Sequence, residues 1–349
     1  MVIDIIRNRD GFCIYGAQVV AYGAYTAIRY LCGKQPECFL VNRSEGNPRD
    51  IEGIPVCSTW ESMPKDSLVI VAVTELLQGE IAKDLESAGF INVFLLTQHE
   101  EHLLMSAYFA NIGKFPVAEL SAHAISVDLA MYEVRNHRDK PLSTRPPLRE
   151  FEHTIQAGSD ITKERIAKIL DHTGENISAR NKQYCEMTAT YWVWKNTKHD
   201  WKGIEHYRRH LLVEPEMLTD DVDAILPLPY ICYPNTLAQF RRFVSEDVLQ
   251  ALLRALRDLH PSEYEEYLAI LQGKYQYTYN LVCARDDVFD DYCTWFFRIT
   301  ECMEGMADEV PEIGNTRALS YVAEVLTNLY FMSHQEVWRI WHVEKAIYV

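Results

Sequence analysis

The sequence predicts an α/β protein of two domains. At 349 residues the chain is long enough for two domains with separate cores. Its first hundred residues alternate between short apolar runs and amphipathic segments, which is typical of βαβ units around a parallel, doubly wound sheet. From His99 to Ser126 the pattern is weak, and strands and longer helices are expected again afterwards. We therefore expect a first domain over 1–100, a connecting segment over 101–126 and a second domain over 127–349.

In the first domain the apolar runs are expected to be strands. The run LVIVAV at 68–73 is continuously apolar, as expected of a strand buried on both faces. The helix expected over 76–88 ends at Gly89. The other elements expected here are strands at 12–15, 38–41 and 93–96 and a helix over 19–31.

The turn after the first strand, GAQVVA at 16–21, only partly matches a dinucleotide-binding turn. In that motif a middle glycine lets the backbone approach the pyrophosphate, whereas Gln18 stands here. Asn-Arg at 42–43 occupies the place of the acidic residue that would hold the ribose. NAD is therefore not expected as a cofactor. The domain resembles Rossmann-like modules found at the front of some sugar-modifying enzymes, and IEGIPVCS at 51–58 is typical of them. Nucleotide binding at Gly16 and Gln18 and a scaffold role are both left open.

The second domain is expected to open with a strand over 127–134, followed by the loop RNHRDKP at 135–141. Further along, Ser245 is placed to cap a helix with a leucine-rich stripe from 248 to 259. The other elements expected are a strand at 224–227, a helix over 261–272, a strand at 277–283, a helix face over 289–303 and a helix over 316–331.

The stretch from 176 to 209 is unusually rich in polar aromatic side chains. Five of its residues recur at steps of 4, 3, 4 and 3, which predicts one helix face: Asn181, Cys185, Thr188, Trp192 and Lys195. Glu186 lies off that face, so a single helix could not aim it at the same ligand. The run HYRR at 206–209 follows, and two adjacent guanidinium forks suit phosphate or carboxylate oxygens.

The segments NISARNKQYCEMTATYWVWKN at 176–196 and GIEHYRR at 203–209 resemble the signature of a bacterial family first catalogued as a domain of unknown function. Its members occur among capsule and exopolysaccharide biosynthesis proteins and are taken to be glycosyltransferases, some similar to galactofuranosyltransferases. The resemblance extends more loosely over 127–331, where IQAG at 155–158 is similar to a short QxG element. It implies a GT-A-like glycosyltransferase domain, a UDP-sugar donor and a saccharide or lipid-linked acceptor.

The resemblance also implies roles for individual residues. Arg208 and Arg209 would hold the diphosphate, His206 would orient a phosphate or hydroxyl, and Glu324 would be the general base. Direct displacement with inversion is expected, because one base carboxylate is easier to nominate than a nucleophile. The other residues expected to contact substrate are Asn136, His137, Gln156, Asn181, Glu186, Trp192, Lys195, Asn196 and Arg317. A purely structural role is the alternative for each of them.

The sequence Asp221-Val222-Asp223 is a literal match to the Asp-x-Asp that holds Mn²⁺ or Mg²⁺ in many nucleotide-sugar enzymes. It precedes the apolar run at 224–226 instead of following a strand, so a solvated strand start is favoured over a metal site. Permanently charged guanidinium groups could neutralise the leaving diphosphate without a metal.

Composition narrows the classes of function. A net charge of −16 argues against a nucleic-acid-binding protein. The nine cysteines are scattered with no CxxC pair, which favours reduced thiols in the cytoplasm, and the longest apolar run is too short to span a bilayer. Peripheral attachment to the inner face of the membrane and homo-oligomer formation are left open. Two other functions are weighed: a non-catalytic nucleotide-sugar or partner-binding module of a polysaccharide assembly complex, and a nicotinamide-dependent oxidoreductase, which Gln18 disfavours.

Overall fold

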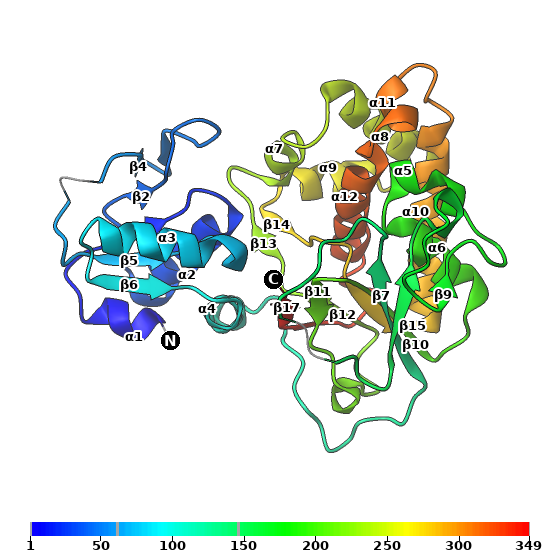
Figure 1. Ribbon diagram of the computed structural model, residues 1–349, viewed down its shortest axis with the longest axis horizontal. Coiled ribbons are helices and arrows are strands. Elements are labelled where there is room, and N and C mark those ends of the chain that lie inside the picture. Colours follow the sequence, from blue (N-terminus) through cyan, green and yellow to red (C-terminus); the bar gives the residue numbers. More distant parts are fainter. Residues whose placement is uncertain (1, 61–62, 145–146, 349) are drawn as a thin grey trace. The chain divides into compact units, whose positions relative to one another are not determined.

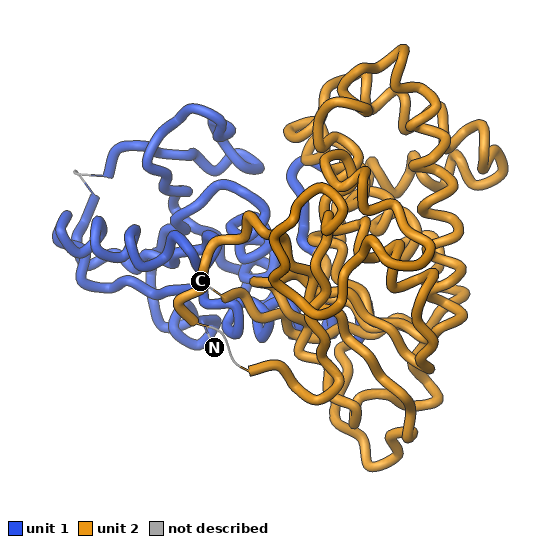
Figure 2. Tube along the Cα trace, turned by 45° about the vertical axis from the view of Figure 1, so that its right-hand side comes forward, with its two compact units in different colours: residues 1–116, 230–235 blue, residues 117–229, 236–349 orange. Residues whose placement is uncertain are grey.

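The computed structural model describes residues 2–60, 63–144 and 147–348, which fall into two compact units (Figures 1 and 2). Unit 1 comprises residues 1–116 and 230–235, and unit 2 comprises residues 117–229 and 236–349. The segment expected to connect the domains, 101–126, is divided between them. Its first part belongs to a helix at Gln98–Asn111 with a buried apolar face, and that face packs inside unit 1.

Unit 1 is a mainly parallel α/β sheet domain. Its elements are α1 (Val2–Arg7), β1 (Phe12–Tyr15), α2 (Val19–Cys32), β2 (Phe39–Leu40), β3 (Asp50–Ile51), β4 (Ile54–Cys57), β5 (Leu68–Val71), α3 (Glu75–Ser87), β6 (Asn92–Leu95), α4 (Gln98–Asn111) and β13 (Tyr230–Ile231). The six-stranded sheet has the order β3-β4-β2-β1-β5-β6, with only β3 antiparallel to its neighbour. The chain moves outward from β1 to β2 and then returns to β5 on the other side of β1. This topology confirms the predicted Rossmann-like fold.

The turn after β1 has structural reasons for its sequence. Gly16 has a φ of 121°, and a Cβ there would lie 2.5 Å from the carbonyl oxygen of Ala72. The amide of Gln18 donates to Oδ1 of Asn47 at 2.8 Å, which ties the turn to the following loop. Nucleotide binding by Gly16 and Gln18 stays a prediction.

Unit 2 is built around a mixed nine-stranded sheet. Its strands are β7 (Leu129–Arg135), β8 (Glu152–Gln156), β9 (Ile169–Leu170), β10 (Trp201–His206), β11 (Arg209–Leu211), β12 (Ala224–Pro227), β15 (Val282–Arg285), β16 (Ile340–Val343) and β17 (Lys345–Ile347), with β14 (Tyr275–Gln276) outside this sheet. The main order is β16-β12-β15-β10-β7-β8-β9, and β15 runs antiparallel to both of its neighbours. The parallel strands β10, β7 and β8 therefore end at the same edge.

Helices cover this sheet. They are η1 (Ser159–Ile161), η2 (Ser178–Arg180), α5 (Asn181–Tyr184), α6 (Met187–Asn196), η3 (Pro215–Met217), α7 (Thr236–Phe240), α8 (Glu246–Leu259), α9 (Tyr264–Gln272), α10 (Asp286–Glu304), α11 (Pro311–Asn315) and α12 (Ala318–Ser333). Helix α10 packs on β10 and β15 and also contacts α8 and α12 (Figure 1). The apolar face expected over 289–303 is buried, and the hydroxyl of Ser245 accepts a hydrogen bond from the backbone of Val248, as a cap should.

The structure differs from expectation in three places of unit 2. The predicted helix through Cys185 is interrupted there, because Cys185 has a φ of 49°. The strand expected at 277–283 begins only at Val282, as part of β15, and the residues before it are irregular, with φ values of 70° at Tyr279 and 53° at Asn280. Residues 201–206, for which no strand was expected, form the central strand β10.

Across the described ranges 2–60, 63–144 and 147–348, none of the helices combines the length with the apolar character that a bilayer span requires.

Candidate functional site

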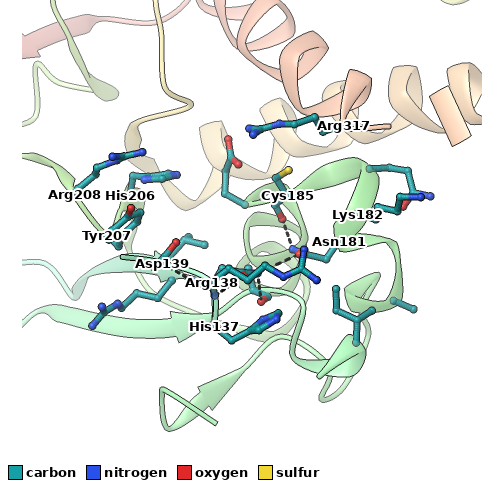
Figure 3. Close-up of a pocket in the computed structure, with 18 residues that line it drawn as sticks. His137, Arg138, Asp139, Asn181, Lys182, Cys185, His206, Tyr207, Arg208 and Arg317 are labelled. Atoms are coloured by element: carbon teal, nitrogen blue, oxygen red, sulfur yellow. Dashed lines mark hydrogen bonds between the residues drawn. The ribbon is translucent and has the colours of Figure 1, made fainter. Parts of the chain in front are cut away.

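A cleft of about 850 Å³ opens in unit 2 at the carboxyl ends of β7 and β10 (Figure 3). Ligands of open α/β sheets commonly bind at such an edge. The loop after β7, the turn after β10, the region of α5 and the residue before α12 all reach this cleft. Its lining is Val134, Arg135, Asn136, His137, Arg138, Asp139, Ala157, Ile161, Ala179, Asn181, Lys182, Gln183, Cys185, Glu186, His206, Tyr207, Arg208 and Arg317.

The cleft brings together seven of the residues singled out in the sequence, from four separate segments: Asn136, His137, Asn181, Glu186, His206, Arg208 and Arg317. Sequence reasoning missed the charged neighbours Arg135, Arg138, Asp139 and Lys182. A signal for three of them was present, because the loop at 135–141 is dense in charge directly after a predicted strand.

Several nitrogen atoms of residues that line the cleft have no hydrogen-bond partner among the described residues. The Nε atoms of Arg135 and Arg208 and the Nδ1 atoms of His137 and His206 are buried and make no hydrogen bond within the described part of the chain. Figure 3 shows His206 and Arg208 side by side at one end of the cleft. Unpartnered buried donors are costly, at about 1–3 kcal/mol each, and an anionic ligand would satisfy them.

Burial and the neighbouring cations determine the charge state of His206. Burial, together with the charges of Arg209 and Arg208, lowers the pKa of His206 to about 3, so the imidazole is neutral at pH 7. Burial raises the pKa of Asp139, although its carboxylate accepts a 2.8 Å hydrogen bond from the backbone of Asn136. Since neither His206 nor Asp139 adds positive charge, the positive charge of the cleft comes from its arginines.

A pair of carboxyl groups lies near these cations. Burial raises the pKa of Glu186, which lines the cleft and accepts a hydrogen bond from Nδ2 of Asn280 at 3.0 Å. Burial and then the charge of Glu186 raise the pKa of Glu324 to about 7. Arg209 and Arg317 act on both carboxyl groups and partly offset these effects. Glu324 is not among the lining residues, but it shares the electrostatic environment of the cleft.

The backbone around Glu186 is in a conformation that side chains rarely adopt. Cys185, Tyr279 and Asn280 all have positive φ values, of 49°, 70° and 53°. Such conformations persist only when surrounding contacts hold them, and they gather at functional sites. The break at Cys185 turns the chain between α5 and α6, so Asn181 and Glu186 both line the cleft. This corrects the expectation that one continuous helix would keep them apart.

A buried carboxylate fixes the turn beside Asn181. Asp171 is fully buried and accepts hydrogen bonds from the backbones of Gly158 and Ser159 at 2.8 and 2.9 Å. It also accepts from the hydroxyls of Ser159, Ser178 and Thr188. Thr188 in turn accepts from Asn181 at 3.0 Å. Asp171 therefore joins η1, η2 and α6 behind the cleft.

Arg209 lies outside the set of lining residues. Its guanidinium group stacks over the ring of Tyr279, with the carbon of the group 4.2 Å from the ring centre. Its Nε atom is buried without a hydrogen-bond partner in the part of the chain that the structure describes. Its position next to the two carboxyl groups makes it their counter-charge rather than a lining donor.

Four other predicted contacts support the scaffold near the cleft without lining it. Gln156 is buried, and its amide bonds the backbones of Glu164 and Ile166. Trp192 donates from Nε1 to the carbonyl of Thr173 at 2.8 Å. Nζ of Lys195 lies 3.3 Å from the centre of the Trp194 ring. The amide of Asn196 accepts from the backbone N–H of Glu175 and donates to the carbonyls of Glu175 and Trp192. Gln156, Trp192, Lys195 and Asn196 thus each hold a loop or a helix end.

The Asp-x-Asp candidate does not fit a metal. Both carboxylate oxygens of Asp223 accept from Arg339, at 2.8 and 2.9 Å, and Arg285 approaches to 2.8 Å. Asp223 is 4% exposed, so the expectation of a solvated strand start is wrong for this residue. Asp221 is exposed and 3.7 Å from Arg339. Neither aspartate lines the cleft, and the pair acts as a structural ion-pair cluster.

Comparisons with known proteins place this geometry in context. A family model described as a domain of unknown function (DUF4422) matches residues 134–336. No curated protein matches the chain. A solved structure described as the apo form of WbbM, a bifunctional glycosyltransferase, is similar with a TM-score of 0.56 and 23% sequence identity, over 63% of this chain and 45% of that one. The chain thus spans less than half of that protein. The likeness concerns the fold and confirms the predicted class, a Rossmann-like unit followed by a GT-A-like α/β unit.

Proposed function

The chain belongs to the family described as a domain of unknown function (DUF4422), and we propose that it is a glycosyltransferase. The reaction proposed is transfer of a hexose, with galactofuranose as the candidate, from a UDP-sugar to a saccharide or lipid-linked acceptor. Capsule or exopolysaccharide synthesis is the proposed setting. The observation that carries the proposal is the cleft itself, where buried guanidinium and imidazole nitrogens without a partner among the described residues occur together with the acidic groups of Glu186 and Glu324.

The diphosphate of the donor fits the end of the cleft where His206 and Arg208 lie (Figure 3). Arg208 and Arg135 carry permanent charge, and their planar forks suit phosphate oxygens. The neutral ring of His206 can donate one hydrogen bond without adding charge. Negative charge grows on the diphosphate as the bond to the sugar breaks, so these groups would bind the transition state more tightly than the intact donor.

Glu324 is the proposed general base. With a pKa of about 7 it can accept a proton near neutral pH, where an ordinary glutamate would be a weaker base. In the proposed step the acceptor oxygen attacks the anomeric carbon and its proton passes to Glu324. The bond from that carbon to the diphosphate oxygen breaks, and the electron pair leaves with UDP. Glu186 and Arg317 would orient the acceptor, and a single displacement of this kind inverts the anomeric centre.

The test is UDP release from a panel of UDP-hexoses in the presence of lysate acceptors. Arg208→Ala is expected to lower kcat/KM by about 100-fold or more, as loss of a charged contact in a transition state commonly does. Arg298→Ala is the matched control, because Arg298 is exposed on α10. Full activity of Arg208→Ala would reject the assignment of the diphosphate site. Saturable UDP-sugar binding with no UDP release would favour a non-catalytic binding module.

A further inference from the structure

A second polar cluster lies within unit 2, and the proposed reaction does not use it. Glu152 of β8, Glu205 of β10 and His210 of β11 are 7%, 1% and 3% exposed. One ligand atom from each lies within 4.8 Å of the others. Glu205 directly precedes His206 in β10, so the two side chains point to opposite faces of the sheet. The cluster is therefore separate from the cleft, which His206 lines.

Two atoms of this cluster have no hydrogen-bond partner among the residues described. They are Oε1 of Glu205 and Nε2 of His210. Nδ1 of His210 is 3.4 Å from Oε1 of Glu205, which is an ion-pair distance only if the imidazole is protonated. Buried polar atoms that lack a partner destabilise a fold, so native structures almost always supply one.

The charge of the cluster also calls for a cation. Glu133 adds a third buried carboxylate, with Oε1 3.8 Å from Nε2 of His210. Arg149 brings a permanent positive charge to the cluster, since its Nε donates to Glu152 at 2.6 Å. The same guanidinium group also bonds the carbonyl of Val213, so it is fixed at the side of Glu152. When ionised, Glu152 and Glu205 together carry more negative charge than this one guanidinium group offsets in a buried place.

We propose that Glu152, Glu205 and His210 bind a divalent transition-metal ion, Mn²⁺ or Zn²⁺. Two carboxylate oxygens and one imidazole nitrogen are a ligand set that both ions accept. Arg149 would then orient the Glu152 carboxylate from outside, as partners of metal ligands commonly do. The ion neutralises the carboxylates and gives the unpartnered atoms of Glu205 and His210 a ligand.

The position of this site indicates a structural role. Glu205 and His210 flank the two-residue turn between β10 and β11, and that turn carries Arg208. Glu152 lies on a different strand, β8. An ion held by all three residues would fix the hairpin to the sheet and so hold Arg208 in place. This role does not require that the protein be a glycosyltransferase.

The experiment measures metal content and stability, not activity. The purified full-length chain is analysed for metals, treated with chelator, and then titrated with Mn²⁺ or Zn²⁺ alone. Tm and, for Mn²⁺, the paramagnetic resonance of the free ion are recorded. We expect one site per chain and a saturable rise in Tm of several degrees, because an ion that binds only the folded state stabilises it. Glu205→Gln keeps the shape of the side chain and is expected to abolish both effects.

Asp221→Asn is the matched control, because it removes a carboxylate from the Asp-x-Asp pair and leaves the buried cluster intact. It should bind metal as the unaltered chain does. His210→Gln serves as a second variant, and circular dichroism of each variant reports whether it folds. Absence of both bound metal and a Tm response in the unaltered chain would overturn the proposal and leave protonated carboxyl groups as the explanation. Unchanged binding by folded Glu205→Gln, or loss of binding in Asp221→Asn, would overturn it as well.

Discussion

The side-chain amide of Asn280 donates to Glu186 across 3.0 Å from a backbone held at a φ of 53°. The hydroxyl of Thr327 donates to Oδ1 of Asn280 at 2.9 Å, which leaves the amide nitrogen to face the glutamate. Residues with a positive φ other than glycine are most often asparagine or aspartate. Both residues tolerate a left-handed backbone, but only asparagine also has an NH₂ group that can donate a hydrogen bond to a carboxylate.

Replacing the donor amide of Asn280 by a carboxylate should impair the function of Glu186 and Glu324. Asn280→Asp removes the hydrogen bond and places a like charge beside Glu186, so kcat/KM for UDP release should fall by about 10- to 100-fold. Asn280→Gly is the control, because it permits the same backbone and removes the bond without adding charge. The kcat/KM of Asn280→Gly should fall less than that of Asn280→Asp. Equal activities of Asn280→Asp and the unaltered chain across the neutral pH range would refute the role of this contact.

Activity and stability should respond to pH in opposite directions through Glu324. Its pKa is raised from 4.5 to about 7, so the folded protein holds the proton more tightly than the unfolded chain does. As pH rises from 4.5 to about 7, this group therefore lowers the free energy of unfolding, while the base form needed for transfer becomes populated. We expect kcat/KM to rise tenfold per pH unit below about 7 and then level off.

Glu324→Gln separates the two effects. The variant should lose transfer activity at every pH, and its free energy of unfolding relative to the unaltered chain should increase as pH rises through the same window. Denaturant unfolding at several pH values provides the measurement. A stability difference that does not vary with pH would show that the pKa of Glu324 is not raised.

Asp171 is expected to be the most sensitive polar residue behind the cleft. In the unaltered chain five hydrogen-bond donors face the carboxylate of Asp171. Asp171→Asn would place an amide NH₂ group, itself a donor, among them. The free energy of unfolding should fall by about 3 kcal/mol, as for other buried networks of this kind. This corresponds to a fall in Tm of roughly 6–12 °C. Asp160→Asn, an exposed change in the adjacent turn, should leave Tm unchanged. Similar Tm values for both variants would contradict the role of Asp171 in joining these elements.

Gly158 is expected to be necessary for two reasons: its positive φ, and the lack of space for a Cβ beside Asn181. Its φ is 65°, and a Cβ there would lie 2.5 Å from Cγ and Oδ1 of Asn181. Gly158→Ala should therefore displace Asn181 and raise the KM for the donor. Gly113→Ala is matched in backbone, with a φ of 67°, but its Cβ would meet no atom within 4 Å. Both changes should cost about 1–2 kcal/mol of backbone strain, and only the first should alter KM. An unchanged KM in Gly158→Ala would argue against a role for Asn181 in donor binding.

Elements with a strong local pattern could be predicted from the sequence. The continuously apolar run at 68–73 contains strand β5, which lies between β1 and β6, and the aromatic stripe over 289–303 is the buried face of α10. Burial of such segments follows from the spacing of apolar side chains, which is visible in one chain. The same reasoning found the cap at Ser245.

Strand β10 was missed because its buried charges hide its pattern. Lys202 and Glu205 are 2% and 1% exposed, and charged residues normally indicate a solvated segment. Lys202 pairs with Asp286, and Glu205 lies beside His210. These neighbours come from other elements, so the sequence around 201–206 does not reveal why its charged side chains are buried.

The sequence indicated some of the residues that line the cleft, but not the geometry that brings them together. The family resemblance pointed to Asn181, Glu186 and Arg208, which the cleft brings together. No local signal marks Cys185 as the residue that breaks the helix, because only tertiary contacts hold its backbone at a positive φ. The pairing of Glu186 with Asn280 is likewise a contact between segments distant in sequence.

The side chains of the hairpin from Glu205 to His210 face two different chemical environments. His206 and Arg209 are directly paired across the hairpin, while Glu205 and His210 project to the reverse side of the sheet. Adding or deleting one amino acid within a strand would exchange these sides; in β11 it would bring Arg209 or Leu211 to the buried position of His210. The spacing of this hexapeptide should consequently tolerate neither insertions nor deletions, even where single side chains can be exchanged.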